Sequence, residues 1–187
     1  VRGMKIAIVT FGCKANQYDS AYMEESLRLN GWQVVPPFQE ADAYIVNTCT
    51  VTQRADMQCR QLIRRLRREW SGSTLIATGC YAQVNPDALA RIPGIDAVLG
   101  LQERATLVEF LKGLSKGGNG QRPVVKVESL ASVGQAPAGE DVTFFGPATS
   151  SSRTRAFFKI QDGCDLSCSF CIVPKARGRS RSLAPEK

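Results

Sequence analysis

The sequence predicts an α/β fold with a mainly parallel sheet and helices on both of its faces. Of the 187 residues, 43% are hydrophobic and 22% are charged, which is ordinary for a globular protein with one good core. Over about the first 115 residues, short apolar runs alternate with longer segments of helical periodicity. Strands that alternate with helices pair in parallel and are covered on both faces, so a Rossmann-like or flavodoxin-like arrangement is expected.

The individual elements follow in order along the chain. Five short apolar runs predict strands over residues 4–11, 32–36, 43–48, 74–79 and 96–100. After the first strand, Asn16 is expected to cap a helix that continues to about Asn30, and Gly31 is expected to end it. Two later helices are expected, a short one after Pro86 and one over residues 103–114.

The longest predicted helix covers residues 53–70 and is rich in arginine. Its apolar side is expected to contain Met57, Leu62, Ile63 and Leu66. Its basic side chains are Arg54, Arg60, Arg64, Arg65, Arg67 and Arg68. They could contact phosphate groups, but an exposed helix face is often rich in arginine, so a solvated surface is the favoured interpretation.

The composition changes after this region. Residues 4–115 are expected to form the α/β domain, and residues 116–152, rich in glycine, proline and serine, a linker with a small β element at 124–128. Residues 153–187 are expected to begin a second domain, with a strand at 155–163. Because so few residues cannot complete a domain, the chain is expected to be the N-terminal part of a longer protein.

Charge and hydropathy bear on partners and compartment. The net charge of +7 favours a polyanionic partner such as nucleic acid. No apolar run reaches the ~20 residues that span a bilayer. The apolar N-terminal segment is too short for a signal peptide and has no small-residue cleavage site after it. A cytoplasmic protein is therefore expected.

The seven cysteines are odd in number, which rules out a complete set of disulfides within the chain. Grouped cysteines in a cytosolic protein more often serve metal or redox chemistry. Histidine is absent, so the chain supplies no histidine-containing zinc site. Any metal is therefore expected to be held mainly by sulfur.

Three early cysteines, Cys13, Cys49 and Cys80, each follow a predicted strand. The carboxyl ends of parallel strands lie on one edge of a sheet, where binding sites form, so these cysteines are expected to meet there. The alternative is that each is a small buried apolar residue, as free cysteine often is. Cys59 lies inside the long helix and is interpreted in that second way.

Three late cysteines, Cys164, Cys168 and Cys171, have C-x3-C-x2-C spacing. Three thiolates in one tight loop can bind three irons of a cubane cluster and leave the fourth iron open. Structural zinc normally has four protein ligands, and no fourth cysteine or histidine lies nearby. A redox pair of Cys168 and Cys171 would leave Cys164 unexplained.

With Phe170 before the last cysteine, this loop resembles the radical SAM motif. The resemblance implies that the open iron binds S-adenosylmethionine, whose reductive cleavage gives a 5′-deoxyadenosyl radical, and that the aromatic side chain lies near the adenine. It also implies that residues 153–187 begin a radical SAM (β/α) barrel.

The segments TFGCKANQYDS, NTCTVTQRAD and TGCYAQ around the early cysteines resemble the N-terminal domain of the methylthiotransferases. With the late loop, the resemblance covers about residues 4–112 and 155–182. It implies that Cys13, Cys49 and Cys80 hold a second [4Fe–4S] cluster, so that the cofactors are two such clusters and S-adenosylmethionine.

The segments GCKANQYDS and NTCTVT resemble one branch of that family most. This implies a transferase that inserts a methylthio group at C2 of N6-threonylcarbamoyladenosine 37 in the anticodon loop of tRNA, and a fragment inactive by itself. Other branches act on isopentenyladenosine in tRNA or on a ribosomal protein. A different class stays open, a metal-stabilised RNA-binding module whose thiols are structural.

Four basic residues follow the late cysteines, namely Lys175, Arg177, Arg179 and Arg181. Their alternation predicts an extended segment with one basic face, which could contact tRNA phosphates, the cofactor carboxylate or an anionic cluster. An ordinary solvated surface is the alternative. Pro174 and Arg177 also match the methylthiotransferases after their last cysteine.

Overall fold

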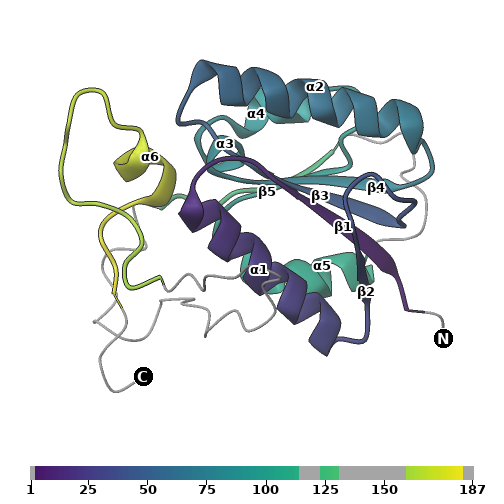
Figure 1. Cartoon of the computed structure of the whole chain (residues 1–187). Coiled ribbons are helices and arrows are strands. Elements are labelled where there is room, and N and C mark those ends of the chain that lie inside the picture. The colour runs from purple at the N-terminus through teal and green to yellow at the C-terminus, as the bar shows by residue number, and fades with distance from the viewer. Residues whose placement is uncertain (1–2, 114–122, 131–158, 183–187) are drawn as a thin grey trace.

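The protein forms a six-stranded parallel sheet between two layers of helices (Figure 1). The structure is a computed structural model and describes residues 3–113, 123–130 and 159–182. The sheet order is β2-β1-β3-β4-β5-β6. The strands are β1 (Lys5–Thr10), β2 (Gln33–Val35), β3 (Ala43–Thr48), β4 (Thr74–Gly79), β5 (Ala97–Leu99) and β6 (Val124–Lys126).

The five strands expected from the apolar runs are all present, and the α/β fold class is confirmed. Every residue of β3 and β4 is buried, which explains why these strands are continuous rather than alternating apolar runs. Successive side chains point to opposite faces, so Val46 packs into one core and Ile45 into the other. One core lies under α2 (Gln53–Glu69) and α4 (Pro86–Ala90), and the other under α1 (Lys14–Leu29) and α5 (Leu107–Gly113).

The helix α1 begins earlier than expected. Cys13 is its N-cap residue, and the prediction that Asn16 caps it is wrong, because Asn16 lies inside the first turn with its side chain fully buried. The predicted end is confirmed, since Asn30 is the C-cap and Gly31 follows with a φ of 77°, which favours glycine.

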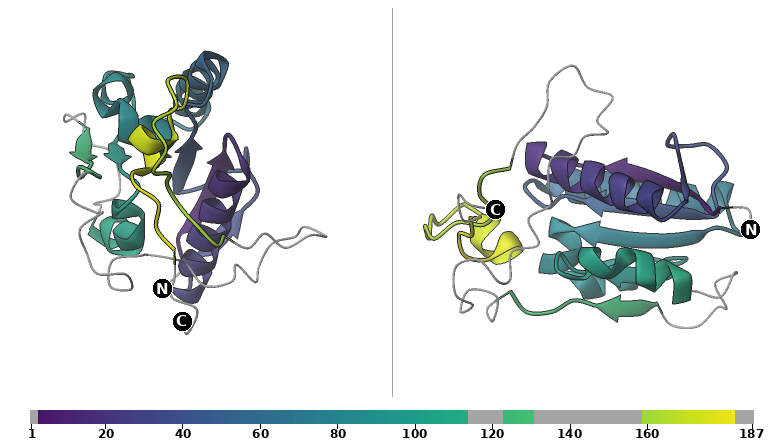
Figure 2. Two further views of the ribbon diagram at one scale, coloured as in Figure 1. Left: turned by 90° about the vertical axis from the view of Figure 1, so that its left-hand side faces the viewer. Right: turned by 90° about the horizontal axis from the view of Figure 1, so that it is seen from below.

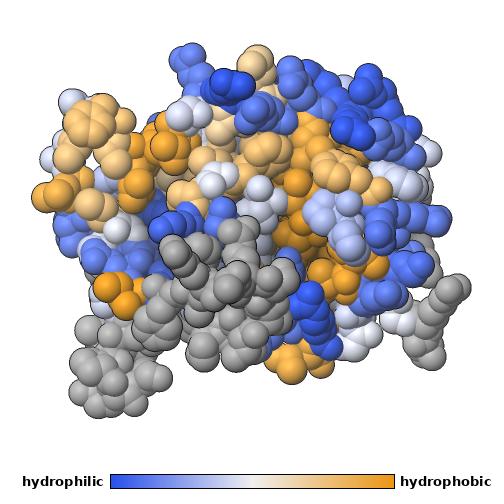
Figure 3. Space-filling model, in the orientation of Figure 1, coloured by the Kyte–Doolittle hydropathy of each residue, from blue (hydrophilic) through white to orange (hydrophobic). Residues whose placement is uncertain are grey.

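The helix α2 begins where Thr52 accepts a hydrogen bond from the backbone N–H of Ala55. Its buried side chains are Cys59, Ile63 and Leu66, at the i, i+4, i+7 spacing of one helix face. Met57 was expected on that face but is 49% exposed, because it lies two positions from Cys59 and points away. The outer side of α2, along the top of Figure 3, is mainly hydrophilic.

Two short elements were not recognised as such in the sequence, whereas the strand expected in the linker is present. The helix α3 (Cys80–Val84) begins directly after β4, before the predicted helix α4. The segment predicted from residue 103 divides into a 3₁₀ turn, η1 (Glu103–Thr106), and α5. The β element expected in the linker is β6, which pairs in parallel with β5 and extends the sheet.

Residues 159–182 pack against the carboxyl edge of the sheet. They contain α6 (Val173–Arg177) and a single antiparallel bridge between Asp162 and Arg181. Figure 2, left, looks onto this edge with the yellow segment in front of the strands. Of the strand expected over residues 155–163, the part up to 158 lies outside the described residues, and the rest forms only the bridge at Asp162.

The extended basic segment expected after the late cysteines is also partly helical, because α6 includes Lys175 and Arg177. Among the helices in the described part of the chain, none is long and apolar enough to cross a membrane.

Candidate functional site

The carboxyl edge of the sheet carries the three early cysteines on three neighbouring strands. The strands β1, β3 and β4 are adjacent, with Thr10 paired to Asn47 and Thr48 paired to Gly79. The turns that follow these strands therefore lie side by side. Cys13 is exposed at the start of α1, whereas Cys49 and Cys80 are 3% and 5% exposed.

Two glycines allow the turns to pass so close to one another. Gly12 has a φ of 102°, and a Cβ atom there would lie 2.6 Å from the Sγ of Cys49. Gly79 has a φ of 96°, and a Cβ there would collide with the backbone of Thr48. Because a side chain at either position would be strained by the positive φ and would collide with the neighbouring turn, only glycine fits there.

Asn16 connects the three turns. Its Nδ2 donates to the carbonyl oxygens of Phe11 (2.8 Å) and Thr48 (2.9 Å). Its Oδ1 accepts from the guanidinium of Arg177 at 2.6 Å and from the Sγ of Cys80 at 3.6 Å. These contacts take up the hydrogen-bonding capacity of the Asn16 side chain, which is therefore not available to cap α1.

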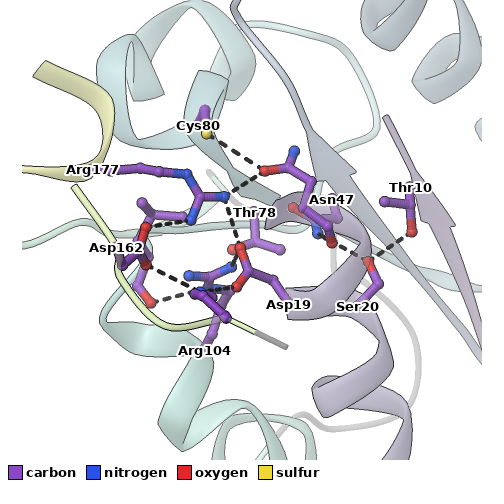
Figure 4. A network of polar contacts seen from close by, with 12 residues as sticks. Thr10, Asp19, Ser20, Asn47, Thr78, Cys80, Arg104, Asp162 and Arg177 are labelled. Atoms are coloured by element: carbon purple, nitrogen blue, oxygen red, sulfur yellow. Dashed lines mark hydrogen bonds and ion pairs between the residues drawn. The ribbon is translucent and has the colours of Figure 1, made fainter. Parts of the chain in front are cut away.

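A buried cluster of charges lies beside Cys80 (Figure 4). Asp19 on α1 has no exposed surface and pairs with Arg104 (2.7 Å), Lys159 (2.6 Å) and Arg177 (2.8 Å). Asp162 pairs with Lys159 at 3.1 Å and with Arg177 at 2.8 Å. We call these five residues the Asp19 cluster. Three cations face two carboxylates, so the cluster carries one excess positive charge.

The cations set the ionisation of the cluster. Burial alone would raise the pKa of Asp19, but the charges of Arg104, Arg177 and Lys159 outweigh it and hold the pKa far below its usual value. The pKa of Asp162 is lowered in the same way by Arg177 and Lys159, against the effect of burial. Both carboxylates are therefore ionised throughout the neutral range.

The buried thiols behave differently. Burial raises the pKa of the Cys80 thiol, and the charge and hydrogen bond of Arg177 oppose the rise without cancelling it. Cys59 is fully buried in the core, and burial raises its pKa to about 12. That position agrees with its interpretation as a buried apolar residue.

The late cysteines lie on a loop that stands out from this edge. Cys168 is exposed, Cys164 and Cys171 are partly buried, and the Phe170 side chain is 91% exposed. The N–H of Cys171 donates to the carbonyl of Cys168, and the N–H of Cys164 to the carbonyl of Gly178, both at 3.1 Å.

Within residues 3–113, 123–130 and 159–182, no three cysteine or carboxylate side chains are already arranged to hold a metal ion. The donor types nevertheless fit an iron–sulfur cluster, because each group offers three thiols. The ligand role of both groups stays a prediction.

The basic residues after the late cysteines have different environments. Lys175 and Arg179 are exposed and line an open groove of about 760 Å³ between α6 and residues 127–130. Arg181 is partly buried and donates to the carbonyl of Arg177. Arg177 itself is 4% exposed, so its expected contact with tRNA does not agree with its position in the Asp19 cluster.

The arginines of α2 are partly engaged within the protein. Arg67 pairs with Asp96 at 2.5 Å, and Arg65 pairs with Glu69 at 2.8 Å. Three arginines of α2 are exposed and form no ion pair within the described part of the chain, namely Arg54, Arg64 and Arg68.

Sequence reasoning missed four of the five members of the Asp19 cluster. One signal was available, since Asp19 follows Asn16 by three residues and so lies on the same face of α1. Nothing local marks the others, which are Arg104, Lys159 and Asp162.

Comparison with known proteins shows which family the chain matches. Residues 5–100 match the sequence model described as "Uncharacterized protein family UPF0004". The chain is 35% identical over 184 residues to the threonylcarbamoyladenosine tRNA methylthiotransferase MtaB of Aquifex aeolicus, covering 98% of this chain and 43% of that relative. It is 37% identical over 182 residues to MtaB of Bacillus subtilis, covering 97% and 38%.

A relative named for another substrate is nearly as similar. The ribosomal protein uS12 methylthiotransferase RimO of Chloroflexus aurantiacus is 34% identical over 190 residues, covering 96% of this chain and 40% of the relative. The chain thus spans less than half the length of the curated relatives it matches.

Proposed function

Since the chain belongs to the Uncharacterized protein family UPF0004, we propose that it is the N-terminal part of a radical SAM methylthiotransferase. The observation that carries the proposal is that the base of the late cysteine loop packs against the same carboxyl edge that carries the early cysteines. Cys80 and the base of the late loop share contacts there through Asn16 and Arg177. An enzyme that uses two cofactors on one substrate atom needs both at the same place.

Each cysteine group would hold one [4Fe–4S] cluster, which agrees with its three sulfur donors. Cys13, Cys49 and Cys80 would hold the first, and Cys164, Cys168 and Cys171 would hold the second, together with S-adenosylmethionine. When bound, these cofactors supply a carbon radical and the sulfur of a new C–S bond, chemistry that no side chain provides. Phe170 is exposed and free to pack against an adenine.

The protein's own residues would bind the cofactors and shield them from water. The Cys49 and Cys80 side chains are buried, so the turns around them exclude water from that side of the site. Cys168 in the late loop is exposed, so a large substrate could approach the site there. Lys175 and Arg179 line the neighbouring groove and, with the partly buried Arg181, are candidates for tRNA phosphate contact.

We propose threonylcarbamoyladenosine 37 in the tRNA anticodon loop as the target. The names of the Aquifex and Bacillus relatives support this choice, as do the segments GCKANQYDS and NTCTVT. A base in a loop is accessible to recognition as a splayed-out nucleotide. Acting on tRNA would place the protein in the cytoplasm. The similarity to the Chloroflexus relative keeps a ribosomal protein as the second candidate.

A hybrid enzyme tests the target. Residues 1–187 replace the matching part of the Bacillus subtilis relative in a strain that lacks that relative, and the hybrid's accumulation is checked by immunoblot. Mass spectrometry of tRNA nucleosides should then show the methylthio derivative of threonylcarbamoyladenosine. The same hybrid with Cys13→Ala should give none. A soluble hybrid that methylthiolates only isopentenyladenosine, or only the ribosomal protein, would contradict the proposed target.

A further inference from the structure

The late loop is fastened at both of its ends to the same carboxylate. Lys159 precedes Cys164 by five residues, and Arg177 follows Cys171 by six. Both pair with Asp19, at 2.6 Å and 2.8 Å. Asp162, also at the base of the loop, pairs with the same two cations. Both ends of the loop that carries the late cysteines therefore contact the same buried side chain of α1, Asp19.

The part of α1 that contacts the late loop also contacts the early cysteine group. Asp19 lies on α1, the helix that Cys13 begins. The guanidinium of Arg177 and the thiol of Cys80 both donate to the Oδ1 of Asn16. The side chain of Asn16 therefore connects Arg177 at the base of the loop with Cys80 of the first cysteine group, and Arg177 also acts directly on the Cys80 thiol.

Arg177 is suited to fix an orientation because its guanidinium is a rigid planar fork. One nitrogen, Nη1, donates to Asp162, while Nη2 donates to Asp19 and Asn16. These contacts are buried, where charge-assisted hydrogen bonds are strong and weakly screened. An apolar contact could stabilise the junction equally well but would let the loop slide, since burial is non-directional.

We infer that Arg177 is a positioning residue that holds the late cysteine loop at a fixed place against the early cysteine edge, through the buried carboxylate of Asp19. The inference rests on the proposed function for its purpose, because two cofactors must face one substrate atom. Its structural content is independent of any metal, and the test below uses the metal-free chain.

Hydrogen–deuterium exchange, followed by mass spectrometry on the 187-residue chain, tests this with three variants. Arg177→Met keeps the length and removes the charge, and Arg177→Lys keeps the charge and removes the fork. The matched control is Arg67→Lys, since Arg67 also bridges a carboxylate, Asp96, and backbone carbonyls, but at α2.

In Arg177→Met, amide exchange in residues 163–182 should rise at least tenfold, while β3 and β4 keep their protection. Arg177→Lys should give a smaller rise in the same residues. Arg67→Lys should leave residues 163–182 unchanged. If the amides of residues 163–182 exchange as slowly in Arg177→Met as in wild type, the inference is overturned. So would an equal rise throughout the chain, because it would show a general loss of stability rather than loss of position.

The outcome is separable from that of the proposed function. If iron never binds to either cysteine group but the exchange pattern is as expected, the positioning role stands and the proposed function fails. If iron binds but Arg177→Met exchanges like wild type, the proposed function stands and Arg177 is not the positioning residue.

Discussion

At the scale of single residues, the two glycines before the early cysteines are the clearest determinants of the site's shape. Gly79 combines a φ of 96° with contact to the backbone of Thr48 and the side chain of Asn47. Gly31, at the end of α1, has a φ of 77°, but a Cβ atom there would meet nothing within 4 Å. Comparing Gly79 with Gly31 separates the cost of the backbone conformation from the cost of crowding.

Replacement of these glycines by alanine should therefore have unequal effects. Gly31→Ala should lower the free energy of unfolding by about 1 kcal/mol, the cost of the left-handed backbone. Gly79→Ala should lower it by about 3 kcal/mol, because overpacking adds to that strain. Urea unfolding followed by circular dichroism measures both. Equal losses would show that crowding at Gly79 is relieved at no cost.

Asp19 gives the site a defined pH dependence. Its pKa is lowered in the folded state, so its contribution to stability is present above the unfolded value of about 3.9 and is lost as pH falls towards the folded pKa. Above pH 5, Asp19→Asn should lower the free energy of unfolding by about 3 kcal/mol, because it removes the carboxylate that pairs with Arg104 and leaves three buried cations facing Asp162 alone.

The difference between wild type and Asp19→Asn should stay constant from pH 5 to pH 8 and shrink as pH falls from 4 to 2. Denaturant titrations at each pH measure it. A difference that persists undiminished at pH 2 would mean that Asp19 does not carry the charge assigned to it.

At the scale of elements, the burial pattern of α2 separates two apolar residues that the sequence grouped together. Ile63 is fully buried, whereas Met57 is 49% exposed. Ile63→Ala should lower the free energy of unfolding by about 2–5 kcal/mol, and Met57→Ala by about 0.5 kcal/mol or less. Similar losses in chemical denaturation would contradict the orientation of α2.

The elements that could be predicted are those with a strong local signal. The runs that became β3 and β4 are buried on both faces, so their apolar character is continuous in the sequence. By contrast, α3 and α6 have five residues each, too few to show a helical period. The strand β6 was expected within residues 124–128, but all three of its residues are exposed, and nothing in its sequence indicated that it pairs with β5.

At the scale of the whole molecule, strand order explains how much of the site could be predicted. Each early cysteine follows a strand, and parallel strands end at one edge, so the placement follows from local pattern and topology alone. The Asp19 cluster could not be found in this way. Its members Arg177 and Asp19 lie 158 positions apart, and no periodicity in the sequence connects them.

The same distance in sequence explains why Arg177 was expected on the surface. A basic residue among other basic residues indicates a solvated or phosphate-binding group, and only the fold shows the buried carboxylate that receives it. Lys175 and Arg179, on either side, do remain exposed.

The most direct test of the central claim is the iron and acid-labile sulfide content per chain after anaerobic reconstitution. It compares wild type with the triple variant Cys13→Ala/Cys49→Ala/Cys80→Ala, and with Cys59→Ala as the matched control. Two [4Fe–4S] clusters require about eight irons in wild type and Cys59→Ala, falling to about four in the triple variant. About four irons in all three proteins, or zinc in place of iron, would contradict the account.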